Sequence, residues 1–285
     1  MNKYKLYISI LLSVTLLWGA QGIAGNSFYY NGTVVTTDII PKYADSHEFN
    51  SAGGSSLLRY GITAGVHATI LPLAYNQMIS SWGRPEGRFH IKDDWAGDNL
   101  GLNDEVSHLF VSYKLMQFLH FGYKSLGFSE KTARIAGIVE TAFIVTAVEF
   151  PIDAYNPDQG MGLSDLLFDY TGIFLACLKI SDSRFDDFDI KTSLRSMSYS
   201  GKNVIGSNSE DYDNYIYWLT YSRSPVVFGL GYGTDHPSSD VQREIYFGVG
   251  STLHDLVAPV SKKAAKYLEF TEFYYLNLRF KLLDF

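Results

Sequence analysis

Residues 103–108 read NDEVSH and residues 163–169 read LSDLLFD, and the rest of the chain is organised around these two segments. Each holds two polar residues four positions apart, Asp104 with His108 and Asp165 with Asp169. Residues four apart share one face of a helix. Glu149 and a later aspartate, Asp153, repeat the spacing. The three pairs predict a polar face on each of three otherwise apolar segments.

These polar faces are expected to point inward. On a helical wheel, Asp104 and His108 share a side with leucines of the same segment, and Glu149 lies on an apolar stripe. A buried ionisable group costs several kcal/mol unless it is paired. Lys114 falls on another side of its helix, so its replacement by Gln is expected to be nearly silent.

Three interpretations of these side chains stand side by side. Carboxylates and a histidine on adjacent helices are the ligands of carboxylate-bridged iron, manganese or magnesium centres, which predicts a divalent metal ion. Alternatively, Asp104, Asp165 and Ser164 cap helices while His108 bonds to a carboxylate. In the third interpretation, clustered carboxylates share protons and the pKa of one rises. The candidate ligands are Asp104, His108, Glu149, Asp153, Asp165 and Asp169, with Asp94 and Asp98 at the rim.

Apolar residues at helical spacing predict helices over 58–80, 104–125, 131–150 and 164–180. The third is apolar almost all round, as a central helix is, and Pro151 must disturb its end. Gly172 and Ala176 align with Asp165 and Asp169, so small residues there would let another helix approach closely. Residues 58–182 are therefore expected to form a helical core that bears the acid and histidine side chains.

Beyond residue 195 the apolar residues alternate with period two, which predicts strands. Residues 181–189 are polar and acidic and are expected to form a linker. Residues 190–285 should form an antiparallel sheet packed on the helices, with a short helix around 261–270. One sheet face is expected to be covered by helices and the other to face a membrane. The predicted fold class is α+β, a helical core of about four helices followed by an antiparallel sheet.

The N-terminus predicts export from the cytoplasm. Lys3 and Lys5 precede the apolar run 6–18, and small residues follow it, which is the order of a secretory signal peptide over residues 1–24. Residues 25–57 are rich in Gly, Ser, Asn and Thr and are expected to form an extended arm. The expected location is the periplasm or outer membrane of a Gram-negative bacterium.

Composition narrows the expected partners. A net charge of −7 argues against non-specific nucleic-acid binding. Aromatic residues make up 15% of the chain, including 21 Tyr, and suit sheets, interfaces and membrane borders. Composition alone favours a Tyr-rich sheet in a soluble protein, while the expected export makes a membrane surface the expected partner. The sequence has no nucleophile elbow, P-loop, thiol–histidine pair or dinucleotide fingerprint, and it does not decide whether the protein is an enzyme.

At these residues the chain resembles the YfiM-like family of predicted periplasmic lipoproteins, a domain of unknown function. The family pattern runs from Asp-Trp to Asp-Lys-x-x-His, then Glu-x-x-x-Asp-Gly, then a Gly-x-Ser-x-x-Asp-x-x-x-Asn-x-x-Gly helix. The corresponding residues here are Asp94-Trp95, Asp104 with His108, Glu149 with Asp153, and Asp165, Asp169 and Gly172. The start of the Asp104 helix is also similar to that of VanZ-like membrane proteins.

The chain departs from the family pattern at four points. Glu105 stands in place of Lys, Ala154 in place of Gly and Asp169 in place of Asn, and the lipobox cysteine is absent. The added acid and the lost lysine favour a bound cation or shared protons. The resemblance implies an envelope protein, membrane-associated, with a structural or cation-binding cluster. The alternatives are a metal-assisted hydrolase acting on a lipid or cell-wall substrate, and a VanZ-like integral membrane protein.

Overall fold

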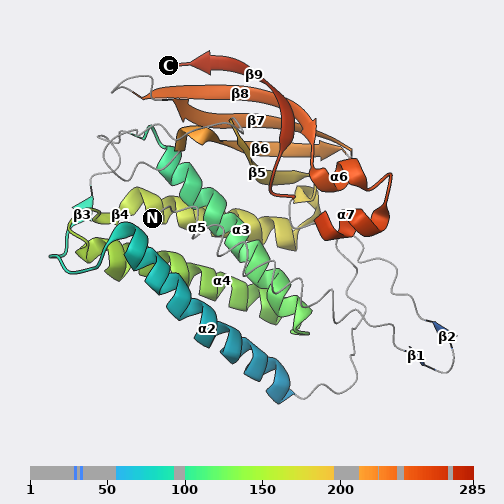
Figure 1. The fold of residues 1–285 in the computed structure, drawn as a ribbon, viewed down its shortest axis with the longest axis horizontal. Helices are drawn as coiled ribbons and strands as arrows, with labels where there is room; N and C mark the ends of the chain where they lie inside the picture. Colours follow the sequence, from blue (N-terminus) through green and yellow to red (C-terminus); the bar gives the residue numbers. More distant parts are fainter. Residues whose placement is uncertain are drawn as a thin grey trace. The chain divides into compact units, whose positions relative to one another are not determined.

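Four long helices followed by a five-stranded antiparallel sheet make up the fold, which confirms the α+β class (Figure 1). The computed structural model describes residues 29–30, 33–34, 56–92, 100–195, 212–223, 225–235, 241–268 and 272–285. The expected signal peptide lies outside these residues, as does most of the expected arm. Of the arm, the structure describes β1 (Tyr29–Tyr30), its antiparallel partner β2 (Thr33–Val34), and residues 56–57, which belong to the first helix rather than to an extended segment.

The chain divides into two compact units, within each of which most of the contacts between residues are made. One comprises Met1–Arg84 and Lys124–Glu130, the other Pro85–Tyr123 and Lys131–Phe285. The first contains α2 (Ser56–Trp82), the expected first helix. Within it Arg59 Nη1 donates to the carbonyl of Gly127 at 2.6 Å. The second unit holds both the remaining core helices and the whole sheet.

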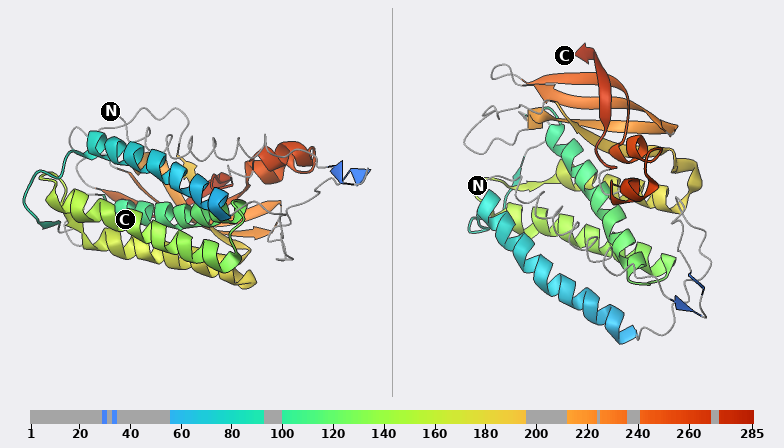
Figure 2. Two further views of the ribbon diagram at one scale, coloured as in Figure 1. Left: turned by 90° about the horizontal axis from the view of Figure 1, so that it is seen from below. Right: turned by 45° about the vertical axis from the view of Figure 1, so that its right-hand side comes forward.

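The core helices of the second unit are α3 (Asn103–Ser125), α4 (Glu130–Ala147) and α5 (Leu163–Ser181), as expected from the apolar spacing. Figure 2 shows α4 and α5 side by side, and Thr146 Oγ1 meets the Tyr170 hydroxyl between them at 2.9 Å. Before Pro151 the regular helix gives way to a π turn, η1 (Val148–Ile152), and then to a 3-10 turn, η2 (Asp153–Tyr155).

One helical stretch among the described residues, Glu130–Tyr155, is long and apolar enough to cross a membrane. Its most apolar window has a mean hydropathy of 1.7, and 28% of that window is buried. Core helices of soluble proteins can be as long and as apolar, so length and composition alone do not assign this stretch to a bilayer.

Small residues allow α3 and α5 to cross closely, as expected. A Cβ on Gly172 would overlap Ser112 Oγ and the Leu109 carbonyl oxygen, and would lie 3.0 Å from the Tyr113 nitrogen. Ala176 is fully buried beside this crossing. The helical core that results is built on Tyr113, Met116, Val145, Ile173 and Ala176.

A short parallel strand pair connects the segment before α3 to the start of α5. β3 (Ile91–Lys92) pairs with β4 (Met161–Gly162), with Lys92 opposite Gly162. The Met161 N–H donates to the His90 carbonyl, and the His90 N–H donates to the Ala154 carbonyl, both at 3.0 Å. This pair places Lys92 beside the first turn of α5.

The sheet has the order β5-β6-β7-β8-β9, antiparallel throughout. Its strands are β5 (Phe188–Leu194), β6 (Tyr215–Arg223), β7 (Val226–Asp235), β8 (Gln242–Ser251) and β9 (Leu276–Asp284). The expected linker over 181–189 is wrong in part, because η3 (Ser183–Phe185) and the start of β5 occupy it. Two helices, α6 (Leu253–Val257) and α7 (Lys262–Leu268), lie between β8 and β9, where one was expected.

The inner face of the sheet has its own core. Trp218 is fully buried there, and a Cβ on Gly231 would lie 2.7 Å from its ring. Thr192 of β5 donates its N–H to the Phe273 carbonyl and accepts from the Tyr275 N–H, each at 2.8 Å, so the two ends of the sheet are joined. The core residues of this face are Ile216, Trp218, Val227, Tyr246 and Tyr275.

The helices pack against the opposite face of the sheet, which carries Tyr217, Leu219 and Leu230 and which we call the outer face. The Phe110 ring of α3 lies 5.6 Å from that of Tyr217, and the Tyr232 hydroxyl donates to the Gly101 carbonyl. Leu219 and Leu230 lie on this same face, since side chains alternate along a strand, and both are exposed. Helices therefore cover part of one face, as expected, while the opposite face is filled by its own core, and contact of the sheet with a membrane stays a prediction.

Candidate functional site

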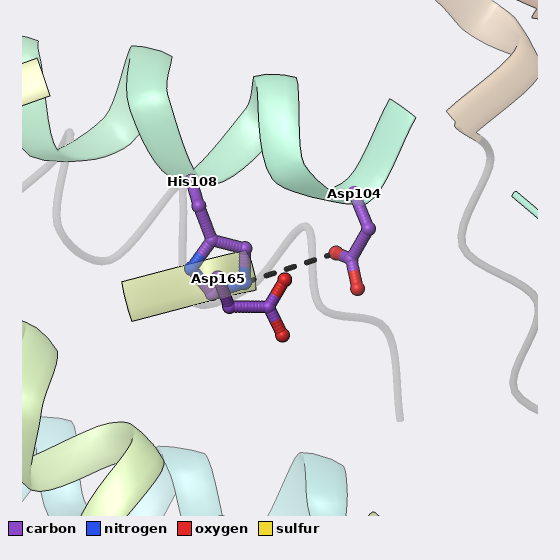
Figure 3. A group of neighbouring side chains, drawn as sticks. All are labelled: Asp104, His108 and Asp165. Atoms are coloured by element: carbon purple, nitrogen blue, oxygen red, sulfur yellow. Dashed lines mark ion pairs between the residues drawn. The ribbon is translucent and has the colours of Figure 1, made fainter. Parts of the chain in front are cut away.

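Asp104, His108 and Asp165 converge where the start of α3 meets the start of α5 (Figure 3). Each offers one donor atom, and the three atoms lie within 4.8 Å of one another. The side chains of Asp104 and His108 are 17% and 23% exposed, whereas that of Asp165 is buried. We call these three residues, with Asp169 and Glu149, the acid/His cluster.

Asp169 fixes the orientation of the histidine ring. Its Oδ2 lies 3.2 Å from His108 Nδ1, and its side chain is buried. The other ring nitrogen, Nε2, lies 3.8 Å from Asp104 Oδ1. A histidine that binds a metal through one nitrogen commonly donates its other N–H to a carboxylate, which sets the tautomer. The arrangement of His108 between Asp169 and Asp104 matches that pattern.

The charges around the ring change its proton affinity. Burial alone would lower the pKa of His108, but the hydrogen bond to Asp169 and the charges of Asp104, Asp169 and Asp165 raise it to about 10. Burial raises the pKa of Asp169, against the opposing effect of His108. These surroundings favour the protonated imidazole, and a metal ion bound to the ring would have to displace a proton.

Glu149 belongs to the same cluster. Its Oε2 accepts a hydrogen bond from the Gly162 N–H at 2.8 Å, at the start of α5. Burial raises its pKa to about 8, the charges of Asp165 and Asp153 raise it further, and His108 acts in the opposite direction. The three predicted pairs thus meet in one region. Glu149 and Asp153 lie outside the three-residue group that could hold a metal ion.

Lys92 is part of this site, although the sequence did not single it out. Its Nζ lies 3.4 Å from Asp104 Oδ2 and 3.6 Å from Asp165 Oδ2. The β3–β4 pairing brings it there, and nothing in the local sequence reveals a two-residue parallel pair. Its ammonium group gives the two carboxylates a positive partner within the protein.

Ser164 and Glu105 pair with each other in the interior. The Ser164 hydroxyl lies 3.2 Å from Glu105 Oε1, and both residues are buried. The residue before α5 is Gly162, without a side-chain cap, so the expectation that Ser164 caps this helix is wrong. Ser112 donates to the backbone carbonyls of His108 and Leu109.

A second charged cluster lies at Asp189. This carboxylate accepts from Lys114 Nζ at 2.8 Å, from Lys191 Nζ at 2.9 Å and from the Tyr113 hydroxyl at 2.9 Å. Burial lowers the pKa of Lys114 to about 8. The expectation that Lys114 is a dispensable surface residue is therefore wrong. A helical wheel shows on which side a residue lies, but not what covers that side.

The other predicted rim residues, Asp94 and Asp98, lie outside the described residues. No family model, no curated protein and no solved structure matches this chain. The function proposed below rests on the residues and geometry of this chain.

Proposed function

We propose that this chain is an exported cell-envelope protein whose acid/His cluster binds a divalent metal ion and which associates with a membrane surface. One observation carries the metal proposal. Donor atoms of Asp104, His108 and Asp165 converge within 4.8 Å, while Asp169 holds the opposite nitrogen of the His108 ring. Imidazole together with carboxylate oxygens suits manganese, iron or zinc.

Charge balance favours a cation at this position. The carboxylates of Asp104, Asp165 and Asp169 face the ammonium of Lys92 and the ring of His108. A divalent ion would neutralise two carboxylates at once and would replace the proton on His108 Nε2. Because clustered carboxylates repel one another, such an ion stabilises the folded protein.

The membrane proposal is supported by the composition, the expected signal peptide and the exposed apolar side chains of the helices. Residues spaced by three or four along α4 and α5 place large apolar groups in solvent. Such surfaces are typical of proteins that bind lipid or another protein. The exposed residues are Ile135, Val139, Phe143, Leu167, Tyr170 and Phe174.

If the cluster holds a metal ion, the purified protein should contain it, and chelation should lower the melting temperature. An ion present at a hundred times its Kd adds about 2.7 kcal/mol to the free energy of unfolding. For a protein of this size that corresponds to roughly 5–10 °C. Asp104→Asn should abolish both the bound metal and the effect of the chelator. Elemental analysis and thermal melts with and without chelator measure the two quantities.

The control is Asp158→Asn, which removes an exposed carboxylate away from the cluster and should keep the effect of the chelator. In chelator, the melting temperature should fall as pH rises from about 4.5 to about 8 through Glu149, and from about 6.5 to about 10 through His108. The folded protein holds protons on His108 and Glu149 more tightly than the unfolded chain, and that stabilisation is lost as these groups deprotonate. The metal proposal would be contradicted if the purified parent contains no metal and chelator does not change its melting temperature. If Asp104→Asn still destabilises that protein, the cluster is a structural network of hydrogen bonds and ion pairs.

A second candidate function is metal-assisted hydrolysis of a lipid or cell-wall substrate. The observation that favours it is a set of three donors, two of them partly exposed, as in catalytic sites that keep a position for water. Metal-loaded protein incubated with phospholipid vesicles or peptidoglycan should then release product, and Asp104→Asn should release none. Stoichiometric metal without product from either substrate would leave the cation-binding function alone.

A further inference from the structure

The outer face of the sheet carries two consecutive apolar rows that cross all five strands. Neither row contains a charged side chain, and Leu278 is 76% exposed and Leu219 58% exposed. Exposed apolar patches of this kind mark interaction surfaces. The first row pairs Ile190, Leu219, Leu230, Phe247 and Phe280. The second pairs Phe188, Tyr221, Phe228, Val249 and Leu278.

These rows are not half of an unfinished core. The inner face is already filled by Trp218, Tyr246 and Tyr275. On the outer face, Phe110 of α3 packs on Tyr217, beside the first row, while Leu230 and Phe280 remain exposed. At the β5 end Ile190 packs against the helical core, and Phe188 and Leu219 line a hollow with Leu175 and Leu178 of α5. The rows are therefore partly covered at that end, and over β7, β8 and β9 they remain exposed although the sheet has a core of its own.

Exposed apolar side chains and two lysines also lie next to each other at the turn between α6 and α7. Val260 is 88% exposed and Leu256 is 53% exposed. Lys262 and Lys263 follow directly and are exposed. The turn lies at the end of the sheet where Ser251, the last residue of β8, pairs with Leu276 at the start of β9. Apolar residues that enter the acyl boundary next to lysines that meet phosphate head groups are typical of proteins that lie on anionic membranes.

We propose that the outer rows and the α6–α7 turn form the surface through which this protein contacts a membrane of anionic phospholipid. The inference rests on the membrane association proposed above and assigns it to particular residues. Charge complementarity favours lipid over a second copy of the chain. The exposed Lys262 and Lys263 match anionic head groups, whereas a second copy docked through the same surface would present the same two lysines and no charge of opposite sign from them.

Co-sedimentation with vesicles tests this assignment. The full chain should bind vesicles of phosphatidylglycerol and phosphatidylethanolamine more tightly than vesicles of phosphatidylcholine. The double variant Val260→Asp/Leu278→Asp should reduce binding to both at least about tenfold, because two apolar contacts are lost. Lys262→Glu with Lys263→Glu should weaken binding only to the anionic vesicles, about fivefold or more for each lysine. All four positions are exposed, so far-UV circular dichroism should match that of the parent.

Two controls decide between surfaces. Lys131→Glu changes an exposed lysine of α4 by the same charge and should leave vesicle binding unchanged. Phe143→Asp removes an apolar group from the rival α4–α5 surface. If Phe143→Asp abolishes binding while Val260→Asp/Leu278→Asp binds like the parent, the assignment to the sheet is overturned but membrane association stands.

Two further outcomes are distinguishable. A parent that binds neither kind of vesicle overturns the membrane association together with this inference, and leaves the metal proposal untouched. Light scattering after size-exclusion chromatography measures the oligomeric state, and so tests whether a second copy of the chain, rather than lipid, binds the outer rows. A parent dimer that becomes monomeric on Leu278→Asp, with lipid binding unchanged, would assign the outer rows to a second copy of the chain.

Discussion

Replacing Gly172 by Ala is expected to lower the free energy of unfolding by about 3 kcal/mol or more, although only one methyl group is added. Its Cβ would overlap Ser112 Oγ and the Leu109 carbonyl, and backbone atoms of α3 cannot move without moving the helix. Separating α3 from α5 would also pull His108 away from Asp169, 3.2 Å distant in the parent. The variant should therefore lose metal binding as well as stability.

Chemical denaturation of Gly172→Ala and of the matched control Gly122→Ala measures this effect. Gly122 lies in α3 with nothing within 4 Å of the Cβ it lacks. There Ala should be neutral or should stabilise the protein by up to about 1 kcal/mol, because glycine is a poor helix former. Equal stability changes in the two variants would show that α3 and α5 do not cross at Gly172.

Asp189→Asn is the other change with a large expected effect, about 3–5 kcal/mol of lost stability. Lys191 is buried, and Lys114 and Lys191 both donate to this carboxylate, so the amide would leave two ammonium groups without their counter-charge. The cost of an uncompensated buried charge exceeds that of the lost hydrogen bonds themselves.

The same site should give the parent an acid-dependent stability. Burial would raise the pKa of Asp189, but the charges of Lys114, Lys191 and Lys179 hold it well below its usual range. A depressed pKa contributes stability that is present above about pH 4 and is lost as the pH falls below it. Asp189→Asn should remove this contribution to the acid side of the stability profile.

The control for Asp189→Asn is Asp187→Asn, two residues earlier. Asp187 is 44% exposed and lies 3.9 Å from Arg223, itself exposed, so its loss should change stability by less than about 1 kcal/mol. Denaturation curves of both variants at neutral and acid pH provide the comparison. An Asp189→Asn variant as stable as Asp187→Asn would show that the lysines do not depend on Asp189.

The helices and the polar pairs could be predicted because their signals are local. A four-residue spacing places Asp104 with His108 and Asp165 with Asp169 whatever surrounds them. The lack of a side chain at Gly172, on the same face, also predicts the close crossing. Close packing also explains a glycine of β7, because Gly231 faces the Trp218 ring and leaves no room for a Cβ.

The contacts that could not be predicted from the sequence join residues that are far apart along the chain. Lys92 reaches Asp104 and Asp165 only because β3 pairs with β4, and Lys114 meets Asp189 only after α3 packs near β5. The start of β5 was misjudged because its flanking acids resemble those of a linker. Asp189 is instead a mostly covered carboxylate that pairs with Lys114 and Lys191.

The joined ends of the sheet affect self-association. A free edge strand offers unpaired N–H and C=O groups on which another chain can add strand by strand, the route to aggregates and fibrils. In β5, Thr192 gives its N–H to Phe273 and its carbonyl to Tyr275. At Thr192 the edge of β5 is therefore already paired within the chain, and the backbone of a second chain cannot add to the sheet at that residue.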